Sequence, residues 1–105
     1  MTILCHSEIF IIKQEDDVRK KYEGVFKYIC SEQRIPSKFL KHIKGEEGLY
    51  EIRVDTDKGY YRTFCCFDSD NVIVLLNSFH KKSNKTPRKE IVKAKLIKTA
   101  YYSNK

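Results

Sequence analysis

The fold is decided by residues 49–76, which read LYEIRVDTDKGYYRTFCCFDSDNVIVLL. Apolar and polar residues alternate from Leu49 to Val54, and this two-residue period predicts a strand with one buried face. Tyr60–Phe67 is expected as the next strand, and Val72–Leu76, apolar on both faces, as the central strand. Turn-forming residues separate the three segments, so the stretch predicts an antiparallel meander that ends near Phe79.

One helix is predicted before this meander, from Gln14 to the residues that precede Ile35-Pro36. The apolar stripe of this helix consists of Val18, Tyr22, Val25, Phe26 and Ile29. Gly24 lies inside the helix at a cost of about 1 kcal/mol relative to alanine, which a close packing contact would explain. The segment from Pro36 to Ile43 predicts a single further helical turn.

A second helix is predicted after the meander. Thr86 followed by Pro87 is a typical helix start, with the threonine as N-cap and the proline at the first helical position. At the N-terminus, Thr2–Cys5 is a short strand or a lead-in, and Ile9–Ile12 is either strand or helix. No repeat or linker interrupts the chain, so the sequence predicts one α+β domain over residues 1–105.

The charge of the chain is unevenly distributed. It carries 21 basic and 14 acidic side chains, a formal net charge of +7. From Lys81 to the end, nine basic residues stand against one acid, Glu90. Such a surface attracts polyanions, of which nucleic acid is the commonest in a cell, although a basic tail also serves as a solvated face or as a site for an acidic partner.

Several classes of protein are excluded or disfavoured. No run approaches the ~18 apolar residues of a membrane span, and the first residues do not form a secretory signal, so we expect a cytoplasmic protein. Phosphate-binding loops, zinc-protease motifs and dinucleotide motifs are absent, and no cofactor is expected. The adjacent Cys65 and Cys66 point to opposite faces of a strand, so buried thiols are favoured over a zinc site built from cysteines and histidines.

The remaining candidates for chemistry are basic. Arg53 and Arg62 lie on neighbouring predicted strands, and simple hairpin register would open both guanidiniums onto one sheet face. The segment after the central strand adds further candidates, namely His80, Lys81, Lys82 and Lys85. Arginine binds phosphate through two parallel hydrogen bonds and histidine moves protons near neutral pH, which together suit metal-free phosphodiester cleavage. Each residue alone is as readily an ordinary surface residue, with the arginines paired to Glu51 or Asp57.

Two sequence blocks carry a resemblance to a known family. The first is Gly48-Leu-Tyr-Glu-Ile-Arg-Val54, followed by Tyr61-Arg62 and by Val72-Ile-Val-Leu-Leu76. The second is Phe79-His-Lys-Lys-Ser-Asn-Lys-Thr-Pro-Arg-Lys-Glu-Ile91, with its double lysine, further lysine and Thr-Pro ahead of a basic run. In this order, over roughly residues 36 to 102, they resemble the HigB-like (phage Gp49-like) branch of the RelE/ParE toxin superfamily.

The resemblance implies a small RelE-like fold with N-terminal helices, an antiparallel curved sheet of three to four strands and a C-terminal helix. It also implies the toxin of a type II toxin–antitoxin system. Such a toxin is a metal-independent, ribosome-dependent mRNA endonuclease, in which the ribose 2′-hydroxyl attacks the adjacent phosphate. The implied partners are mRNA in the ribosomal A site and a helix-turn-helix antitoxin, through which alone the toxin would meet operator DNA.

The resemblance also implies roles for individual residues. By position, Arg62 is expected to hold the scissile phosphate with Arg53 and Lys81 beside it. Our own hypothesis, beyond the resemblance, assigns proton transfer to His80 or to a lysine with a lowered pKa. Contacts to the RNA backbone are expected from Lys82, Lys85, Arg88 and Lys89. Two alternatives stay open, namely a gyrase-inhibiting toxin of the same superfamily and a non-catalytic module that binds nucleic acid or a partner.

Overall fold

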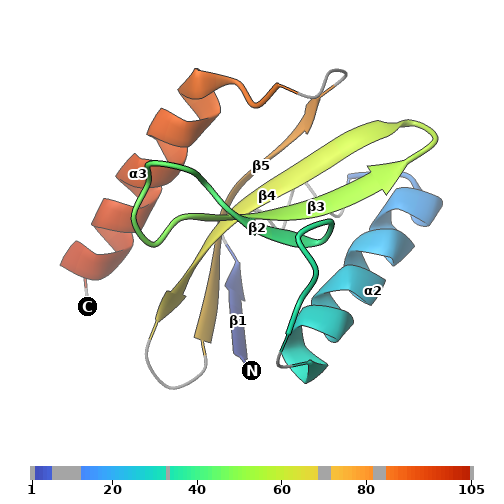
Figure 1. Cartoon of the computed structure of the whole chain (residues 1–105), viewed down its shortest axis with the longest axis horizontal. Coiled ribbons are helices and arrows are strands. Elements are labelled where there is room, and N and C mark those ends of the chain that lie inside the picture. Colours follow the sequence, from blue (N-terminus) through green and yellow to red (C-terminus); the bar gives the residue numbers. More distant parts are fainter. Residues whose placement is uncertain (1, 6–12, 33, 69–71, 82–84, 105) are drawn as a thin grey trace.

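The computed structural model describes residues 2–5, 13–32, 34–68, 72–81 and 85–104. In chain order, its elements are β1 (Thr2–Cys5), α2 (Asp16–Ser31), β2 (Leu40–His42), β3 (Tyr50–Thr56), β4 (Gly59–Asp68), β5 (Val72–Lys81) and α3 (Arg88–Ser103) (Figure 1). The strands form one sheet in the order β1-β5-β4-β3-β2. The predicted α+β class, with a helix before and a helix after an antiparallel sheet, is confirmed.

The predicted meander is confirmed as β3–β4–β5, with antiparallel pairing throughout. β1 runs parallel to β5, with Thr2 opposite Val72, so β5 has a neighbour on each side and is buried as expected. The central strand of the sheet, however, is β4 and not β5 as predicted, because β1 and β2 extend the sheet on its two sides. β5 also continues past Phe79 to Lys81, because the long strand β4 supplies a partner, Tyr60, at that end. The segment Ile9–Ile12, for which strand and helix both stayed open, lies outside the described residues.

The strand β2 corrects one prediction. The backbone N–H groups of Phe39 and Leu40 donate to the Pro36 carbonyl at 3.0 and 3.1 Å, so one turn forms. The helical prediction beyond it is wrong, because Leu40 pairs with Ile52 and the chain continues as a strand. The open edge of β3 offers backbone donors and acceptors to this segment, and satisfying them outweighs a weak local preference for helix.

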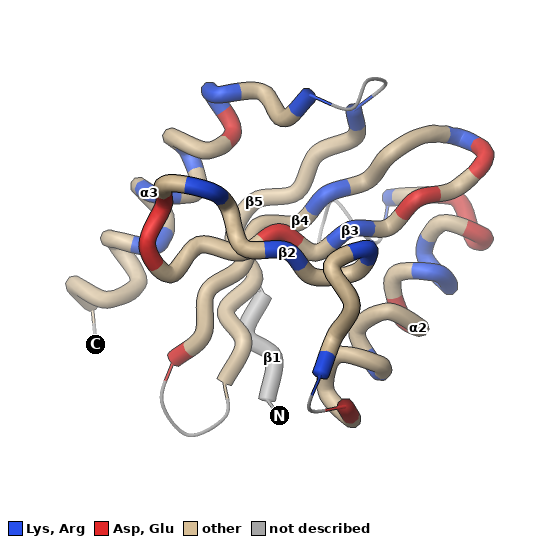
Figure 2. Tube along the Cα trace, viewed as in Figure 1, with Lys and Arg blue, Asp and Glu red and all other residues tan. Residues whose placement is uncertain are grey.

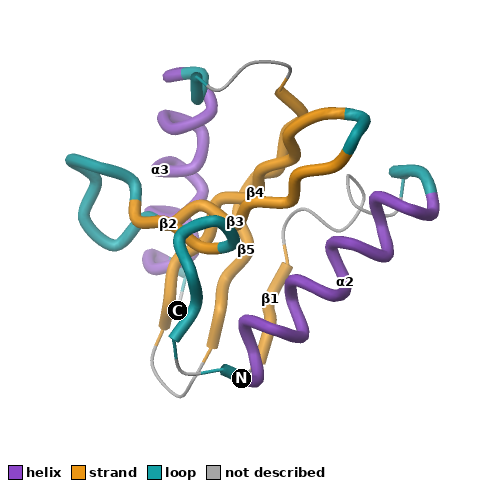
Figure 3. The backbone as a smooth tube through the Cα atoms, turned by 45° about the vertical axis from the view of Figure 1, so that its right-hand side comes forward, coloured by secondary structure: helices purple, strands orange, loops and turns teal. Residues whose placement is uncertain are grey.

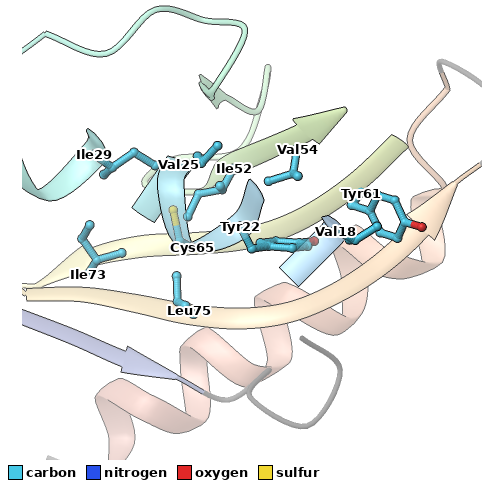
Figure 4. Close-up of a cluster of buried hydrophobic side chains, with 10 residues drawn as sticks. All are labelled: Val18, Tyr22, Val25, Ile29, Ile52, Val54, Tyr61, Cys65, Ile73 and Leu75. Atoms are coloured by element: carbon cyan, nitrogen blue, oxygen red, sulfur yellow. The ribbon is translucent and has the colours of Figure 1, made fainter. Parts of the chain in front are cut away.

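Each face of the sheet is covered by one helix (Figure 3). On the face we call the α2 face, α2 packs on strand residues in the cluster of Val18, Tyr22, Val25, Ile29, Ile52, Val54, Tyr61, Cys65, Ile73 and Leu75 (Figure 4). On the opposite, α3 face, the cluster consists of Leu49, Phe64, Cys66, Val74, Leu76, Phe79, Ile91 and Ala94. The adjacent cysteines therefore point to opposite faces, as predicted, and burial raises the pKa of both thiols.

A bulge in β5 decides which residues reach each face beyond it. Thr63 pairs with Ser78 and Cys65 with Leu75, so β5 has one more residue than β4 between these pairs. Leu76 packs in the α3-face cluster, and the side-chain amide of Asn77 donates to the Glu90 carbonyl of α3 at 3.1 Å. Two consecutive residues thus face α3, and every later residue of β5 lies on the face opposite to the one that simple alternation predicts.

The glycine inside α2 has no packing role. A Cβ atom added to Gly24 would meet no heavy atom of the described residues within 4 Å. The close contact that would have explained this glycine is therefore absent, and its cost to the helix is not offset by packing.

Candidate functional site

The two predicted sheet arginines lie side by side on the α3 face. Arg53 of β3 is the register partner of Arg62 of β4, and Arg62 is in turn opposite Phe79 of β5. Directly opposite residues in an antiparallel pair point to the same face, which confirms that both arginines share a face. Basic and acidic positions alternate along β3 (Figure 2), so carboxylates lie on this face as well.

Glu51 is the centre of this group, whereas the sequence indicated only a surface partner of the arginines. Glu51 is buried, with only 4% of the residue exposed to solvent. Its Oε1 atom lies 3.5 Å from Nε of Arg53 and 3.5 Å from Nε of Arg62. Its Oε2 atom accepts a hydrogen bond of 3.2 Å from the Thr86 hydroxyl, which accepts one of 3.1 Å from Lys81 Nζ. We call these five residues the Glu51 cluster.

Arg62 is buried inside the cluster and does not open onto the surface as predicted. The residue is 1% exposed, and its Nη1 atom donates to Asp55 Oδ1 at 2.5 Å and to the Tyr61 carbonyl at 2.9 Å. The ring of Tyr60 lies 5.6 Å from the guanidinium carbon. An anion that binds Nη1 of Arg62 therefore has to take the place of the Asp55 carboxylate, which is half exposed.

Arg53 forms the accessible side of the cluster. Its side chain is half-buried, and its Nη1 atom donates to the Ser37 carbonyl at 3.3 Å. The Nε atoms of Arg53 and Arg62 are buried, and neither has a hydrogen-bond partner among the described residues, since Glu51 lies at ion-pair distance only. Buried donors in this state retain the capacity to bind an anion oxygen.

Lys81 reaches the cluster from the end of β5. Burial lowers the pKa of its ammonium group below the ordinary value, and although the nearby Glu51 raises it, the charges of Arg62 and Arg53 lower it further. The bulge in β5 is what brings this lysine to the α3 face beside Arg62. A lysine whose pKa is depressed by burial and neighbouring cations is suited to proton transfer.

Thr86 does not cap α3 as predicted. The N-cap position is Pro87, no side-chain hydrogen bond caps the helix, and α3 begins at Arg88. The Thr86 hydroxyl instead connects Lys81 to Glu51. The two charged partners compete for the hydroxyl more strongly than a backbone N–H does, because hydrogen bonds to charged groups are the stronger ones.

The structure does not bring His80 to this cluster. His80 lies on the α2 face, where its ring stacks on Tyr61 with centroids 4.3 Å apart and an interplanar angle of 8°. Its Nε2 atom lies 3.2 Å from the Lys58 carbonyl in the β3–β4 hairpin. A Cβ atom at Gly59, where φ is +140°, would lie 2.2 Å from His80 Nε2, so this hairpin closes over the histidine only with glycine there.

Three of the predicted RNA-binding residues lie at the start of α3 or just before it. Lys85, Arg88 and Lys89 are exposed, and Arg88 Nη1 lies 3.3 Å from Glu46 Oε2. Lys82 lies outside the described residues. Because Thr86 belongs to the Glu51 cluster, these residues flank the cluster and extend its positive charge along the helix.

Within the described residues, no group of three or more His, Cys, Asp or Glu side chains is arranged to hold a metal ion. No helix among them is both long enough and apolar enough to cross a membrane.

Comparison with protein families gives a match over most of the chain. Residues 10–98 match the model of the family described as phage derived protein Gp49-like (DUF891), which covers most of the chain. The chain belongs to this family. The resemblance seen in the sequence blocks is thereby confirmed, and the Gp49-like family is part of the RelE/ParE-like toxin superfamily. No match was found among curated proteins.

Membership in the Gp49-like family indicates a toxin of a toxin–antitoxin system, with an antitoxin as its partner. In this Gp49-like protein, the Glu51 cluster brings together three cations, one buried carboxylate and a hydroxyl. Such a set can bind a phosphate, stabilise added negative charge on it and move a proton.

Proposed function

We propose that this Gp49-like toxin is a ribosome-dependent mRNA endonuclease that cleaves RNA at the Glu51 cluster without a metal. The observation that carries the proposal is the convergence of Arg53, Arg62 and Lys81 around one buried carboxylate on a single sheet face. Two buried guanidinium Nε donors without hydrogen-bond partners among the described residues support an anion as the missing ligand.

In the proposed reaction, the ribose 2′-oxygen attacks the adjacent phosphorus. The new O2′–P bond forms as the P–O5′ bond breaks, which leaves a 2′,3′-cyclic phosphate and a 5′-hydroxyl. Arg62 and Arg53 bind the non-bridging phosphate oxygens and stabilise their growing negative charge. Lys81, whose lowered pKa increases its neutral fraction, accepts the proton of the 2′-hydroxyl and then donates a proton to the departing O5′, which becomes the 5′-hydroxyl.

Substrate binding in this scheme begins with an exchange of carboxylate for phosphate. A phosphate oxygen replaces Asp55 Oδ1 on Nη1 of Arg62. Asp55 is half exposed and can turn into solvent, whereas Glu51 stays buried and holds the cations in position. Lys82, Lys85, Arg88 and Lys89 bind the flanking backbone of mRNA or ribosomal RNA.

The test is induction of the toxin in cells, followed by primer extension on cellular mRNA. We expect new mRNA ends that require translation, and we expect Arg62→Ala and Lys81→Ala to abolish both the ends and the growth arrest. If both variants remain fully toxic, the site assignment is wrong. Intact mRNA together with inhibited DNA supercoiling would identify a gyrase inhibitor instead, and antitoxin binding without toxicity would identify a non-catalytic module.

The proposal extends to the partners. We expect a helix-turn-helix antitoxin, encoded beside the toxin, to neutralise it in a tight complex. In that complex the antitoxin, and not the toxin, would contact operator DNA. The toxin itself would act in the cytoplasm on translating ribosomes.

A further inference from the structure

A hollow lies between α2 and the turn that leads into β2, two segments that run next to each other in Figure 1. One part of it, of about 340 Å³, is lined by Lys21, Gly24, Val25, Tyr28 and Phe39. The adjoining part, of about 280 Å³, is lined by Lys21, Val25, Lys38, Phe39, Arg53 and Asp55. Because the two parts share three residues, they form one groove, which we call the α2 groove.

The α2 groove runs into the Glu51 cluster. Arg53 lines the groove and lies 3.5 Å from Glu51. Asp55 also lines it, forms the ion pair with Arg62 and accepts a hydrogen bond from Lys21 through its backbone carbonyl. A chain-like ligand held at the cluster therefore has a continuous path into the groove, past the edge of β3.

The walls of the groove combine aromatic rings with cations. The rings of Tyr28 and Phe39 lie 5.5 Å apart at 58°, and Tyr28 is 37% exposed. Lys38 Nζ lies 4.9 Å from the centre of the Phe39 ring, and Lys21 lies on the α2 side. Proteins that bind single-stranded nucleic acid use this combination, in which rings contact the bases and cations contact the phosphates.

Gly24 keeps the groove open. It costs the helix about 1 kcal/mol relative to alanine, and no packing contact explains it, because nothing lies within 4 Å of a Cβ built there. It does line the groove, so a larger side chain at this position would project into the space between α2 and the turn.

We propose that the α2 groove binds nucleotides of a single-stranded RNA next to the phosphate held at the Glu51 cluster. A base lies against Tyr28 and Phe39, and Lys21, Lys38 and Arg53 bind the backbone. This inference rests on the proposed function, because it takes the same RNA as its ligand. The groove is continuous with the proposed phosphate site, so one RNA strand can occupy both. An acidic protein segment would contact the cations of the groove but would not account for this continuity.

The test measures RNA binding by fluorescence anisotropy, with a short fluorescein-labelled single-stranded RNA and the full chain. Gly24→Leu fills the groove without changing charge and removes a helix-destabilising glycine, so the variant is expected to fold. Ala100→Leu is the matched control, since it adds leucine at an exposed position of α3 outside the groove. We expect Gly24→Leu to bind RNA about tenfold more weakly, the loss expected for one stacked base, and Ala100→Leu to bind as the wild type does.

Two outcomes would overturn the proposal. One is wild-type RNA affinity in Gly24→Leu. The other is loss of binding to a poly-glutamate peptide in Gly24→Leu with RNA binding unchanged, which would assign the groove to an acidic protein. Cleavage assays keep this test separate from the proposed function. If the wild-type protein leaves mRNA intact while Gly24→Leu still weakens RNA binding, the cleavage proposal fails and the groove proposal stands. If Gly24→Leu binds RNA with wild-type affinity while Arg62→Ala abolishes cleavage, the groove proposal fails and the cleavage proposal stands.

Discussion

The Thr86 hydroxyl donates a hydrogen bond of 3.2 Å to Glu51 across a sequence separation of 35 residues. This contact joins the segment before α3 to the middle of β3 and places Lys81, the other partner of the hydroxyl, beside two arginines. The site is therefore held together by a buried carboxylate and a hydroxyl, neither of which is a candidate for phosphate binding.

Removing the central carboxylate should destabilise the protein. Glu51→Gln leaves the buried charges of Arg62 and Lys81 without their shared anion, and breaking a buried ion pair in this way costs about 3 kcal/mol or more. Urea denaturation measures the loss in the free energy of unfolding. Glu47→Gln, at an exposed position, is the matched control and should change this free energy by less than about 0.5 kcal/mol.

Thr86 should act through its hydroxyl and not as a helix cap. We expect Thr86→Val to lower the free energy of unfolding by about 1–2 kcal/mol, because the Lys81 ammonium group and the Glu51 carboxylate each lose a hydrogen bond to the hydroxyl. We also expect it to slow RNA cleavage. Thr86→Ser should restore both properties, and a serine variant as defective as valine would contradict the role given to the hydroxyl.

Asp55 should compete with phosphate for Arg62. Asp55→Asn removes an ion pair worth about 1 kcal/mol, so the affinity for a short RNA should rise about fivefold. Asp57→Asn removes the same charge from the neighbouring turn without touching Arg62 and controls for net charge. Equal affinities in the two variants would show that only net charge matters.

The lowered pKa of Lys81 should appear in the pH dependence of stability. Between its folded pKa and the unfolded value of 10.5, the unfolded chain binds more protons, so stability rises with pH through that range. Lys81→Met should lack this contribution. Urea denaturation of both proteins at neutral pH and at successively higher pH values measures the free energy of unfolding of the wild type relative to Lys81→Met. This relative free energy should rise with pH, whereas an ordinary pKa at Lys81 would leave it independent of pH.

His80 should be dispensable for cleavage, because it lies on the α2 face. We expect His80→Ala to retain RNA cleavage while losing about 1 kcal/mol of stability with its stacking on Tyr61. Primer extension and urea denaturation measure the two effects. Loss of cleavage in a stably folded His80→Ala protein would return the histidine to the candidate catalytic residues.

Much of the fold follows from local sequence. The alternation in β3 places Arg53 opposite the face that carries Ile52 and Val54, and helical spacing identifies the buried residues of α2. These patterns are readable because each depends only on neighbours within one strand or one helical turn. β2 was missed for the same reason, since its three residues become a strand only through the edge of β3.

The assembly of the site, unlike much of the fold, does not follow from local sequence. Sequence alone determined that the chain is small, basic and α+β, with arginines on adjacent strands and a lysine-rich segment before the last helix. Only the tertiary structure decided that the bulge in β5 turns Lys81 toward the arginines and His80 away from them, and that Glu51 and Thr86 connect the group. The physical reason is that a bulge and a buried ion pair depend on strand register and on the packing of two helices against opposite faces, which no single segment of sequence encodes.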